Sequence, residues 1–159
     1  MESLIIKFAA SFLIWFMYAG LVALWFLDGK IKKEQVLHAL VSGLIAFLIA
    51  EILKEVFHTV RPFMVDRAQV LTLTIPKDGA FPSSHTALAF SLAVTIWLHD
   101  RKTGWLFIAL AFLVGLARIL ANVHYPIDIF GGALLGIFIS FVTDRLHFHD
   151  IIKKIKIRG

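Results

Sequence analysis

The chain alternates long apolar segments with short polar ones, and the apolar segments have the length of membrane-spanning helices. Crossing about 30 Å of hydrocarbon takes roughly 20 helical residues. Residues 8–27 run for twenty positions without a charge, which is too long for the apolar core of a cleaved signal peptide. The pattern predicts five spans, at residues 8–27, 36–57, 84–99, 105–121 and 126 to about 143.

The segment between the second and third spans is too short and too interrupted by Pro and Gly for another span. Its middle, VDRAQVLTLTIPKDG, combines alternating apolar and polar residues with a Pro/Gly turn. This part is expected at the membrane interface, as a strand, a short helix or irregular chain. Pro126 suits a first helical turn, and Gly132-x-x-x-Gly136 suits close helix contact. The fold predicted is an all-α integral membrane protein, a bundle of about five transmembrane helices in a single domain, residues 1–159.

Composition supports a membrane protein. Hydrophobic residues make up 59% and charged residues 17% of the 159 residues, with a mean hydropathy of +0.84; soluble chains have roughly 45–50% and about 25%. The absence of Cys excludes disulfides and thiolate metal sites. The net charge of +5 comes from residues at the ends of apolar segments rather than from one patch, so no nucleic-acid partner is predicted.

The basic residues also predict the orientation in the membrane. Lys and Arg number sixteen, and five spans place ten of them on one side. By the positive-inside rule that side is cytoplasmic, so the C-terminus is expected inside and the N-terminus outside. The ten are Lys30, Lys32, Lys33, Arg101, Lys102, Arg145, Lys153, Lys154, Lys156 and Arg158. On the other side are Lys7, Lys54, Arg61, Arg67, Lys77 and Arg118.

Three cations are expected to meet at the outer face. Lys54 and Arg61 are seven residues apart and share a helix face. Each alone is explained by snorkelling to lipid headgroups. Arg118 reaches the same depth from another helix, and three cations without matching carboxylates indicate an anion site.

The third span opens with Pro82-Ser83-Ser84-His85. One of the two serines is expected to be the N-cap. The positive end of a helix is also a natural cradle for phosphate, and His85 in the first turn would point towards the anion.

His124 and Asp128 bracket the start of the fifth span and allow two interpretations, a buried structural pair or two metal ligands. The cationic neighbours disfavour a metal, because a cation site would gather carboxylates. Glu51 is interpreted as a partner of Lys54 or as part of the helix packing, with no catalytic role.

Taken together, these motifs resemble the three-part signature of the type-2 phosphatidic acid phosphatase superfamily, which includes bacterial lipid phosphatases. The parts are K-x6-RP from Lys54, PSSH from Pro82, and R-x5-H-x3-D from Arg118 to Asp128. Ser84 stands where the usual PSGH has Gly, and Ala117 where the third part usually begins with Ser. The chain also has one span fewer than the usual six.

The resemblance implies a mechanism without metal or cofactor. His124 would be the nucleophile that forms a phosphohistidine, and Asp128 would hold its far N–H. His85 would protonate the leaving oxygen and then activate water. The phosphoryl oxygens would be held by Lys54, Arg61, Ser83, Ser84 and Arg118.

The resulting expectation is a metal-independent phosphatase of a lipid phosphate or diphosphate at the extracytoplasmic face of a bacterial-type inner membrane. Undecaprenyl diphosphate is the favoured substrate, followed by phosphatidylglycerophosphate, phosphatidic acid or lipid A phosphate. The expected partners are the lipid substrate and membrane lipid, without an obligate protein partner. Two alternatives remain open at this point, a small ion or solute transporter and a metal-dependent membrane hydrolase using His124 and Asp128.

Overall fold

The computed structural model describes residues 2–26 and 30–145. The basic residues at 153–158 and the chain at 27–29, which enter the predicted orientation, lie outside the described residues. The described helices are α1 (Glu2–Phe26), α2 (Lys30–Phe57), α3 (Pro62–Asp66), α4 (Ser84–His99), α5 (Arg101–Leu120) and α6 (Pro126–Arg145). The part of the chain that the structure describes contains no strand.

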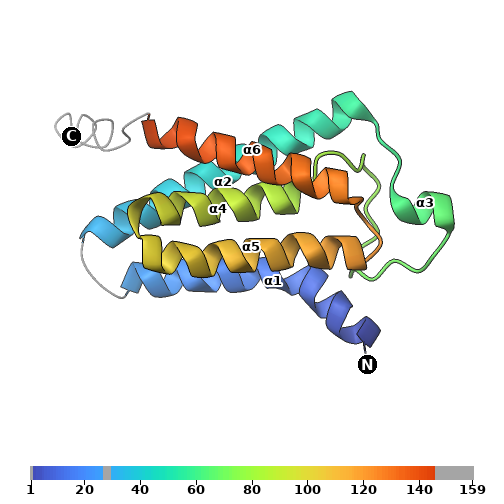
Figure 1. Ribbon diagram of the computed structural model, residues 1–159, viewed down its shortest axis with the longest axis horizontal. Coiled ribbons are helices and arrows are strands. Elements are labelled where there is room, and N and C mark those ends of the chain that lie inside the picture. The colour runs from blue at the N-terminus through green and yellow to red at the C-terminus, as the bar shows by residue number, and fades with distance from the viewer. Residues whose placement is uncertain (1, 27–29, 146–159) are drawn as a thin grey trace.

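The five long helices lie side by side, with α4 at the centre of the bundle (Figure 1). Every residue of α4 from 86 to 96 is buried, because α2, α5 and α6 pack around this sixteen-residue helix. The predicted all-α bundle of five long helices is therefore confirmed. Figure 1 also places the start of α1 and α3 at one end of the bundle and the end of α6 at the other.

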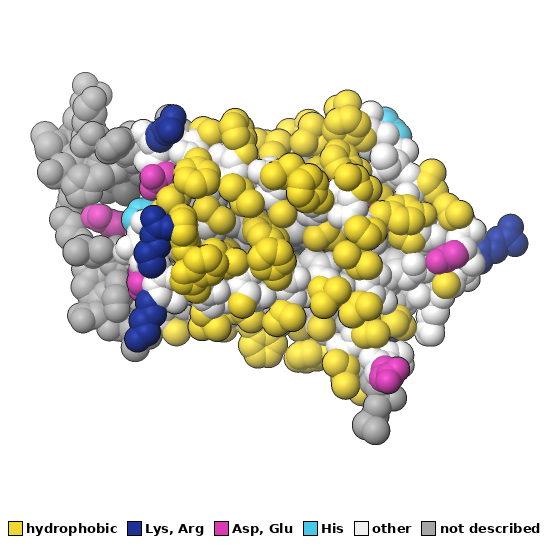
Figure 2. Space-filling view, viewed as in Figure 1, with side chains coloured by type: hydrophobic (Ala, Val, Ile, Leu, Met, Phe, Trp, Pro, Cys, Tyr) yellow, Lys and Arg dark blue, Asp and Glu magenta, His cyan; other side chains and the backbone are white. Residues whose placement is uncertain are grey.

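The outer surface of the bundle is apolar. Four of the described helices, α1, α2, α5 and α6, are long and apolar enough to cross a membrane. Large side chains such as Trp15, Phe112 and Phe138 are more than half exposed on them, and Figure 2 shows hydrophobic side chains over the middle with Lys and Arg at the two ends. The chain is a multi-pass membrane protein.

Helices α4 and α6 approach closely along the two predicted glycines. A Cβ atom on Gly132 would lie 2.5 Å from the carbonyl oxygen of Ser83, and one on Gly136 would lie 2.3 Å from that of Ala87. The same helices share interhelical hydrogen bonds, since the Ser140 hydroxyl donates to the Ser91 carbonyl over 3.0 Å. Small residues and hydroxyls of this kind hold membrane helices together.

We expect Gly132→Ala to lower both the thermal unfolding temperature and the catalytic activity. The added methyl group meets backbone at Ser83, so α6 must move away from the first turn of α4; overpacking of this kind typically costs about 1–3 kcal/mol. Gly43→Ala is the matched control, because its methyl group meets only the ends of the Leu88 and Leu92 side chains at 2.9 Å. Equal unfolding temperatures and activities for the two variants would contradict the prediction.

The segment that follows α3 is irregular and covers one end of the bundle. The Leu71 N–H donates to the Ala121 carbonyl (3.1 Å), and the Ala80 N–H donates to the Thr59 carbonyl (3.0 Å). The Leu73 N–H donates to the Ser11 hydroxyl on α1 over 3.2 Å. Residues 67–83 are therefore tied to α1, to the end of α5 and to the chain after α2, as a cover over the first turn of α4.

Candidate active site

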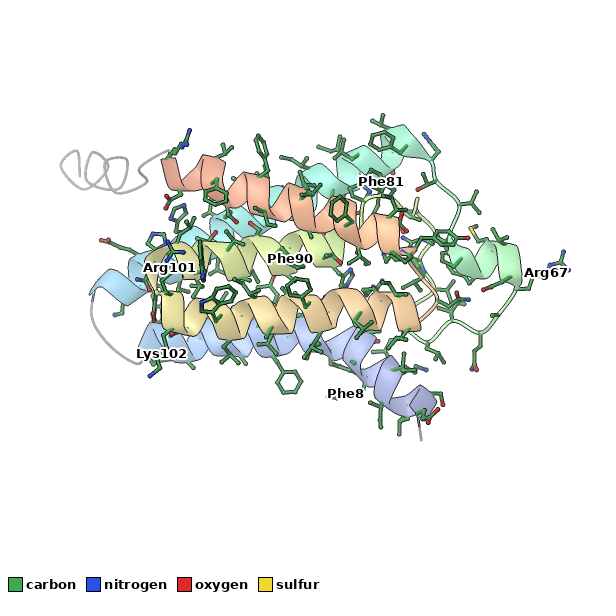
Figure 3. All side chains as sticks on the ribbon, in the orientation of Figure 1. Phe8, Arg67, Phe81, Phe90, Arg101 and Lys102 are labelled. Carbon is green, nitrogen blue, oxygen red and sulfur yellow. The ribbon has the colours of Figure 1, made fainter. Side chains whose placement is uncertain are left out.

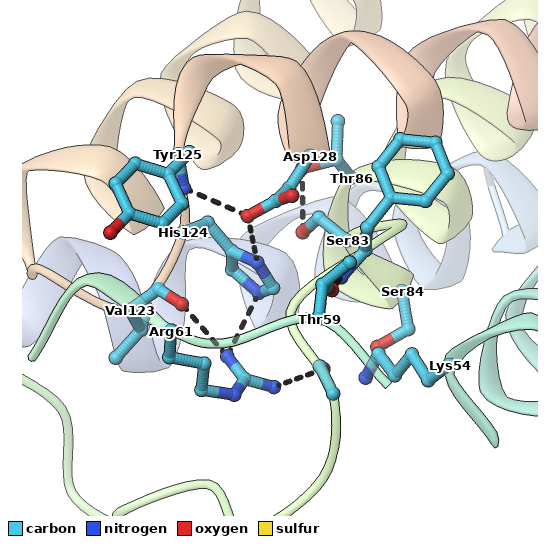
Figure 4. Close-up of polar contacts among 12 residues, drawn as sticks. Lys54, Thr59, Arg61, Ser83, Ser84, Thr86, Val123, His124, Tyr125 and Asp128 are labelled. Atoms are coloured by element: carbon cyan, nitrogen blue, oxygen red, sulfur yellow. Dashed lines mark hydrogen bonds and ion pairs between the residues drawn. The ribbon is translucent and has the colours of Figure 1, made fainter. Parts of the chain in front are cut away.

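Beneath this cover lies a cavity of about 480 Å³. It opens at the end of the bundle where α4 and α6 begin and α5 ends. The structure brings most of the site residues expected from the sequence to its wall, namely Lys54, Arg61, Ser84, His85, Arg118 and His124. Of the remaining two, Ser83 precedes Ser84 at the start of α4 and Asp128 lies behind His124 (Figure 4).

Lys54 turns into the protein rather than towards lipid headgroups. Its side chain is 5% exposed. The ammonium group donates to Glu51 Oε1 (2.7 Å), to Asp78 Oδ2 (2.5 Å) and to the Ser84 hydroxyl (3.0 Å). Of the two interpretations of Glu51, the structure shows the pairing with Lys54, and snorkelling does not describe this lysine.

Arg61 is buried between the cover segment and the turn that carries His124. Its Nε donates to the Asp78 carbonyl (2.9 Å), and its Nη2 donates to Asp78 Oδ1 (2.9 Å) and the Gly79 carbonyl (3.0 Å). Its Nη1 donates to the Val123 carbonyl (2.8 Å) and lies 3.4 Å from His124 Nε2. Figure 4 shows this guanidinium group beside the imidazole. Arg61 therefore joins two loops that are remote in sequence.

Asp78 is the site residue that the sequence analysis missed. The inference that three cations meet without matching carboxylates was wrong, because Asp78 pairs with both Lys54 and Arg61. Burial pushes the pKa of Asp78 upward, but the hydrogen bond from Lys54 and the charges of Lys54 and Arg61 outweigh it, so this pKa lies below its ordinary value. Asp78 lies 24 residues from Lys54 in an irregular segment, where no periodicity reveals the contact.

Arg118 differs from the other two cations in having unfilled hydrogen-bonding capacity. It lies in the last turn of α5 and is 6% exposed. Its Nη1 donates to the Ala10 carbonyl on α1 (3.1 Å), while its buried Nε has no hydrogen-bond partner among the described residues. Within the described chain it also has no carboxylate within salt-bridge distance. A buried donor of this kind favours an anionic ligand in the cavity.

The first turn of α4 borders the same cavity. Ser83 is the N-cap, as expected for one of the two serines, but its hydroxyl makes no capping hydrogen bond. Instead that hydroxyl accepts from Thr86 Oγ1 (3.0 Å), and the Ser83 N–H donates to the Asp128 carbonyl (3.0 Å). Helix α4 is thereby fixed to the first turn of α6, and its positive end is held at the cavity.

His124 lies in the turn between α5 and α6, and its imidazole is held between a carboxylate and a guanidinium group. Asn122 takes a left-handed conformation, with φ of 61°, that Asn tolerates well and that closes this turn. Asp128 Oδ2 lies 3.4 Å from His124 Nδ1 and accepts from the Tyr125 N–H at 2.8 Å. Since Nδ1 faces Asp128, Nε2 is the nitrogen on the side of Arg61 (Figure 4).

Burial and the charges around it lower the pKa of His124 to about 4, with Arg61 and Arg118 opposing the raising effect of Asp128. We therefore expect the imidazole to be neutral at pH 7 and to gain its proton only as the pH falls towards 4. Nitrogen-15 NMR of histidine-labelled protein in detergent measures this, with His124→Gln to assign the signal. A His124 midpoint near 6.5 would contradict the prediction.

Possible metal ligands gather elsewhere. Within the described residues, the group of at least three histidine and carboxylate side chains close enough to share an ion is His38, His99 and Asp144. These lie towards the end of the bundle where α4 and α6 terminate, away from the cavity. The active-site cavity combines three cations with two carboxylates that already hold Lys54 and Arg61, a donor set suited to an anion.

Comparisons with known proteins identify the family and the fold. A family model described as the PAP2 superfamily matches residues 35–151. The bacitracin transport permease protein BcrC of Bacillus licheniformis is 33% identical over 91% of this chain and 73% of its own length. The undecaprenyl-diphosphatase BcrC of Bacillus subtilis is 29% identical over 84% of this chain and 67% of its own. The crystal structure of Aquifex aeolicus LpxE superposes with a TM-score of 0.72 at 25% identity, covering 91% of this chain and 86% of that one.

The family match includes the site residues from Lys54 to Asp128. It also includes most of α2 and all of α3 to α6, but not α1. The structural match extends over nearly the whole bundle. On these grounds the chain belongs to the PAP2 superfamily and is a membrane phosphatase.

Proposed function

We propose that this protein removes the terminal phosphate of undecaprenyl diphosphate at the extracytoplasmic face of the membrane, through a phosphohistidine on His124. The observation that carries the proposal is one cavity whose wall brings three cations together with the His124 imidazole, which is backed by the Asp128 carboxylate. In the first step Nε2 of His124 attacks phosphorus in line, and the P–O bond to the leaving phosphate of the lipid breaks. In the second step water attacks the phosphohistidine and frees inorganic phosphate.

His85 is placed to handle the protons of both steps. It lines the same cavity as His124 and stands in the first turn of α4. It donates a proton to the leaving oxygen and then takes one from the attacking water. Arg118, Lys54 and Arg61, with the serines at the start of α4, hold the non-bridging oxygens while charge spreads over them in a loose transition state.

The wall of the cavity supports a lipid substrate. Besides the polar residues it includes Ala10, Trp15 and Phe47, which belong to α1 and α2. This apolar side gives the lipid tail a place to lie, and each buried CH₂ group contributes about 0.8 kcal/mol. The similarity to an undecaprenyl-diphosphatase favours a polyprenyl diphosphate over the other lipid phosphates considered.

The experiment is phosphate release from undecaprenyl diphosphate by purified protein in detergent, with and without EDTA. The proposal expects release in both conditions and inhibition by vanadate, which imitates the five-coordinate transition state. Loss of activity in EDTA would favour the metal-dependent alternative. Phosphatidic acid, phosphatidylglycerophosphate and lipid A phosphate, compared by kcat/KM, test the choice of substrate.

A transport function is the second candidate, because one relative is named a bacitracin transport permease protein. A transporter would show no phosphate release in the same assay.

The proposed face of action rests on the distribution of basic residues. A reporter fused after Gly159 is expected in the cytoplasm, and a tag before Met1 is expected outside. In the structure the active-site cavity lies at the same end of the bundle as the start of α1. The opposite labelling would move the proposed reaction to the cytoplasmic face.

A further inference from the structure

We propose that Asp78 is an internal anion, which neutralises the phosphate site while it is empty and which the phosphoryl group of the substrate displaces from Lys54. The inference rests on the proposed phosphatase function. The inference adds to that function the group that determines how tightly the site binds phosphate.

Asp78 occupies the hydrogen-bonding positions that a phosphoryl group needs. One carboxylate oxygen accepts from Lys54 and the other from Arg61 Nη2, at 2.5 and 2.9 Å. An ammonium group has three N–H donors, and those of Lys54 are filled by Glu51, Asp78 and Ser84. Lys54 can therefore bind a phosphoryl oxygen only by giving up one of these partners.

Asp78 can leave Lys54 without undoing the rest of the site. Both acidic partners of Lys54 are partly exposed, Glu51 at 38% and Asp78 at 32%, but of the two Asp78 alone also holds Arg61. Its backbone carbonyl and that of Gly79 also accept from Arg61. Rotation of the carboxylate into solvent would therefore leave the guanidinium group anchored by the backbone of the same segment.

Arg118 provides the first contact for the incoming anion. Its buried Nε has no partner among the described residues, so it can bind a phosphoryl oxygen without breaking an existing hydrogen bond. The phosphoryl group then replaces the Asp78 carboxylate on Lys54. Burying two cations without a counter-ion is expensive, so the exchange keeps Lys54 and Arg61 neutralised at every stage.

The test is Asp78→Asn, which removes the charge and keeps the shape of the side chain. Because the wild-type site binds anions in competition with its own carboxylate, we expect the inhibition constants of vanadate and inorganic phosphate to fall about tenfold in the variant. KM should fall as well, and kcat should fall because phosphate leaves more slowly. Tighter anion binding with slower turnover is the combination that a merely structural role would not produce.

Glu55→Gln is the matched control. It removes one negative charge from the residue next to Lys54, but Glu55 is exposed and outside the cavity wall. Its vanadate constant should equal that of the wild type. Weaker vanadate binding by Asp78→Asn would overturn the proposal and assign Asp78 a structural role in holding Lys54 and Arg61.

A binding measurement separates this inference from the proposed function. The increase in thermal unfolding temperature with added inorganic phosphate reports anion binding without turnover. If the wild type releases no phosphate from lipids, the proposed function fails, whereas the comparison of Asp78→Asn with the wild type still decides the role of Asp78. If Asp78→Asn lowers the unfolding temperature without phosphate, Asp78→Ala repeats the comparison, and its phosphate-dependent shift must also exceed that of the wild type.

Discussion

Replacing His124 by alanine is expected to lower kcat by on the order of 10⁴-fold or more, because the substitution deletes the group that accepts the phosphoryl and so closes the covalent route. Asp128 cannot substitute for it, because its carboxylate lies on the Nδ1 side of the ring and also accepts from the Tyr125 backbone. Phosphate release from undecaprenyl diphosphate measures the effect. Near-normal turnover by purified His124→Ala would rule out the phosphohistidine.

Two further variants show whether the loss comes from chemistry or from folding. His58→Asn replaces an exposed histidine at a left-handed position, with φ of 45°, which Asn tolerates, and should keep its activity. Asp128→Asn should lose less than His124→Ala, because the amide can still occupy the place beside Nδ1. The unfolding temperature of each protein must remain close to that of the wild type for the comparison to count.

The second large effect is expected at Arg118. Removing a positioned donor to a developing negative charge costs about 10²–10³-fold in kcat in other enzymes, and we expect a loss of this size for Arg118→Ala. Unlike Lys54 and Arg61, Arg118 has no described carboxylate partner, so its charge is fully available to the phosphoryl group. The inhibition constant of vanadate should rise together with the loss of turnover.

Arg67→Asn is the matched control for Arg118→Ala. Arg67 is exposed at the same end of the molecule and points away from the bundle (Figure 3), in a left-handed conformation with φ of 55°. Removing its charge tests whether long-range attraction of the anionic lipid, rather than a contact in the cavity, explains the effect. Equal losses in the two variants would show that Arg118 acts only through the net charge of this end.

The features that follow from helical periodicity were predictable from the sequence. The apolar runs determine where the five long helices lie, and the spacing of Glu51 and Lys54 places them on neighbouring turns, where they form an ion pair. Gly132 and Gly136 mark a close helix contact, and the structure identifies α4 as the partner.

Contacts between segments that lie far apart in the sequence do not follow helical periodicity, and these were not predictable. Arg118 donates to Ala10 across 108 positions, and Asp78 reaches Lys54 from an irregular segment. Such contacts depend on how loops close over the bundle. From the sequence alone, a charged residue in a loop is interpreted as exposed to solvent. The sequence motif therefore revealed the residues proposed to handle phosphate but not the carboxylate that neutralises two of them.

The length of α4 affects how the reaction meets the bilayer. Its sixteen residues rise about 24 Å, whereas the hydrocarbon layer is about 30 Å thick. Asp100, Arg101 and Lys102 follow its end, and Arg101 stacks on Trp97. Charged residues and Trp are typical of the headgroup level, so we place this end of α4 there. The first turn of α4 then stops roughly one helical turn below the opposite surface. With α4 placed in this way, we expect the phosphate of the proposed substrate to lie beneath the headgroups of neighbouring lipids, and the water that completes hydrolysis to reach it through the polar cavity.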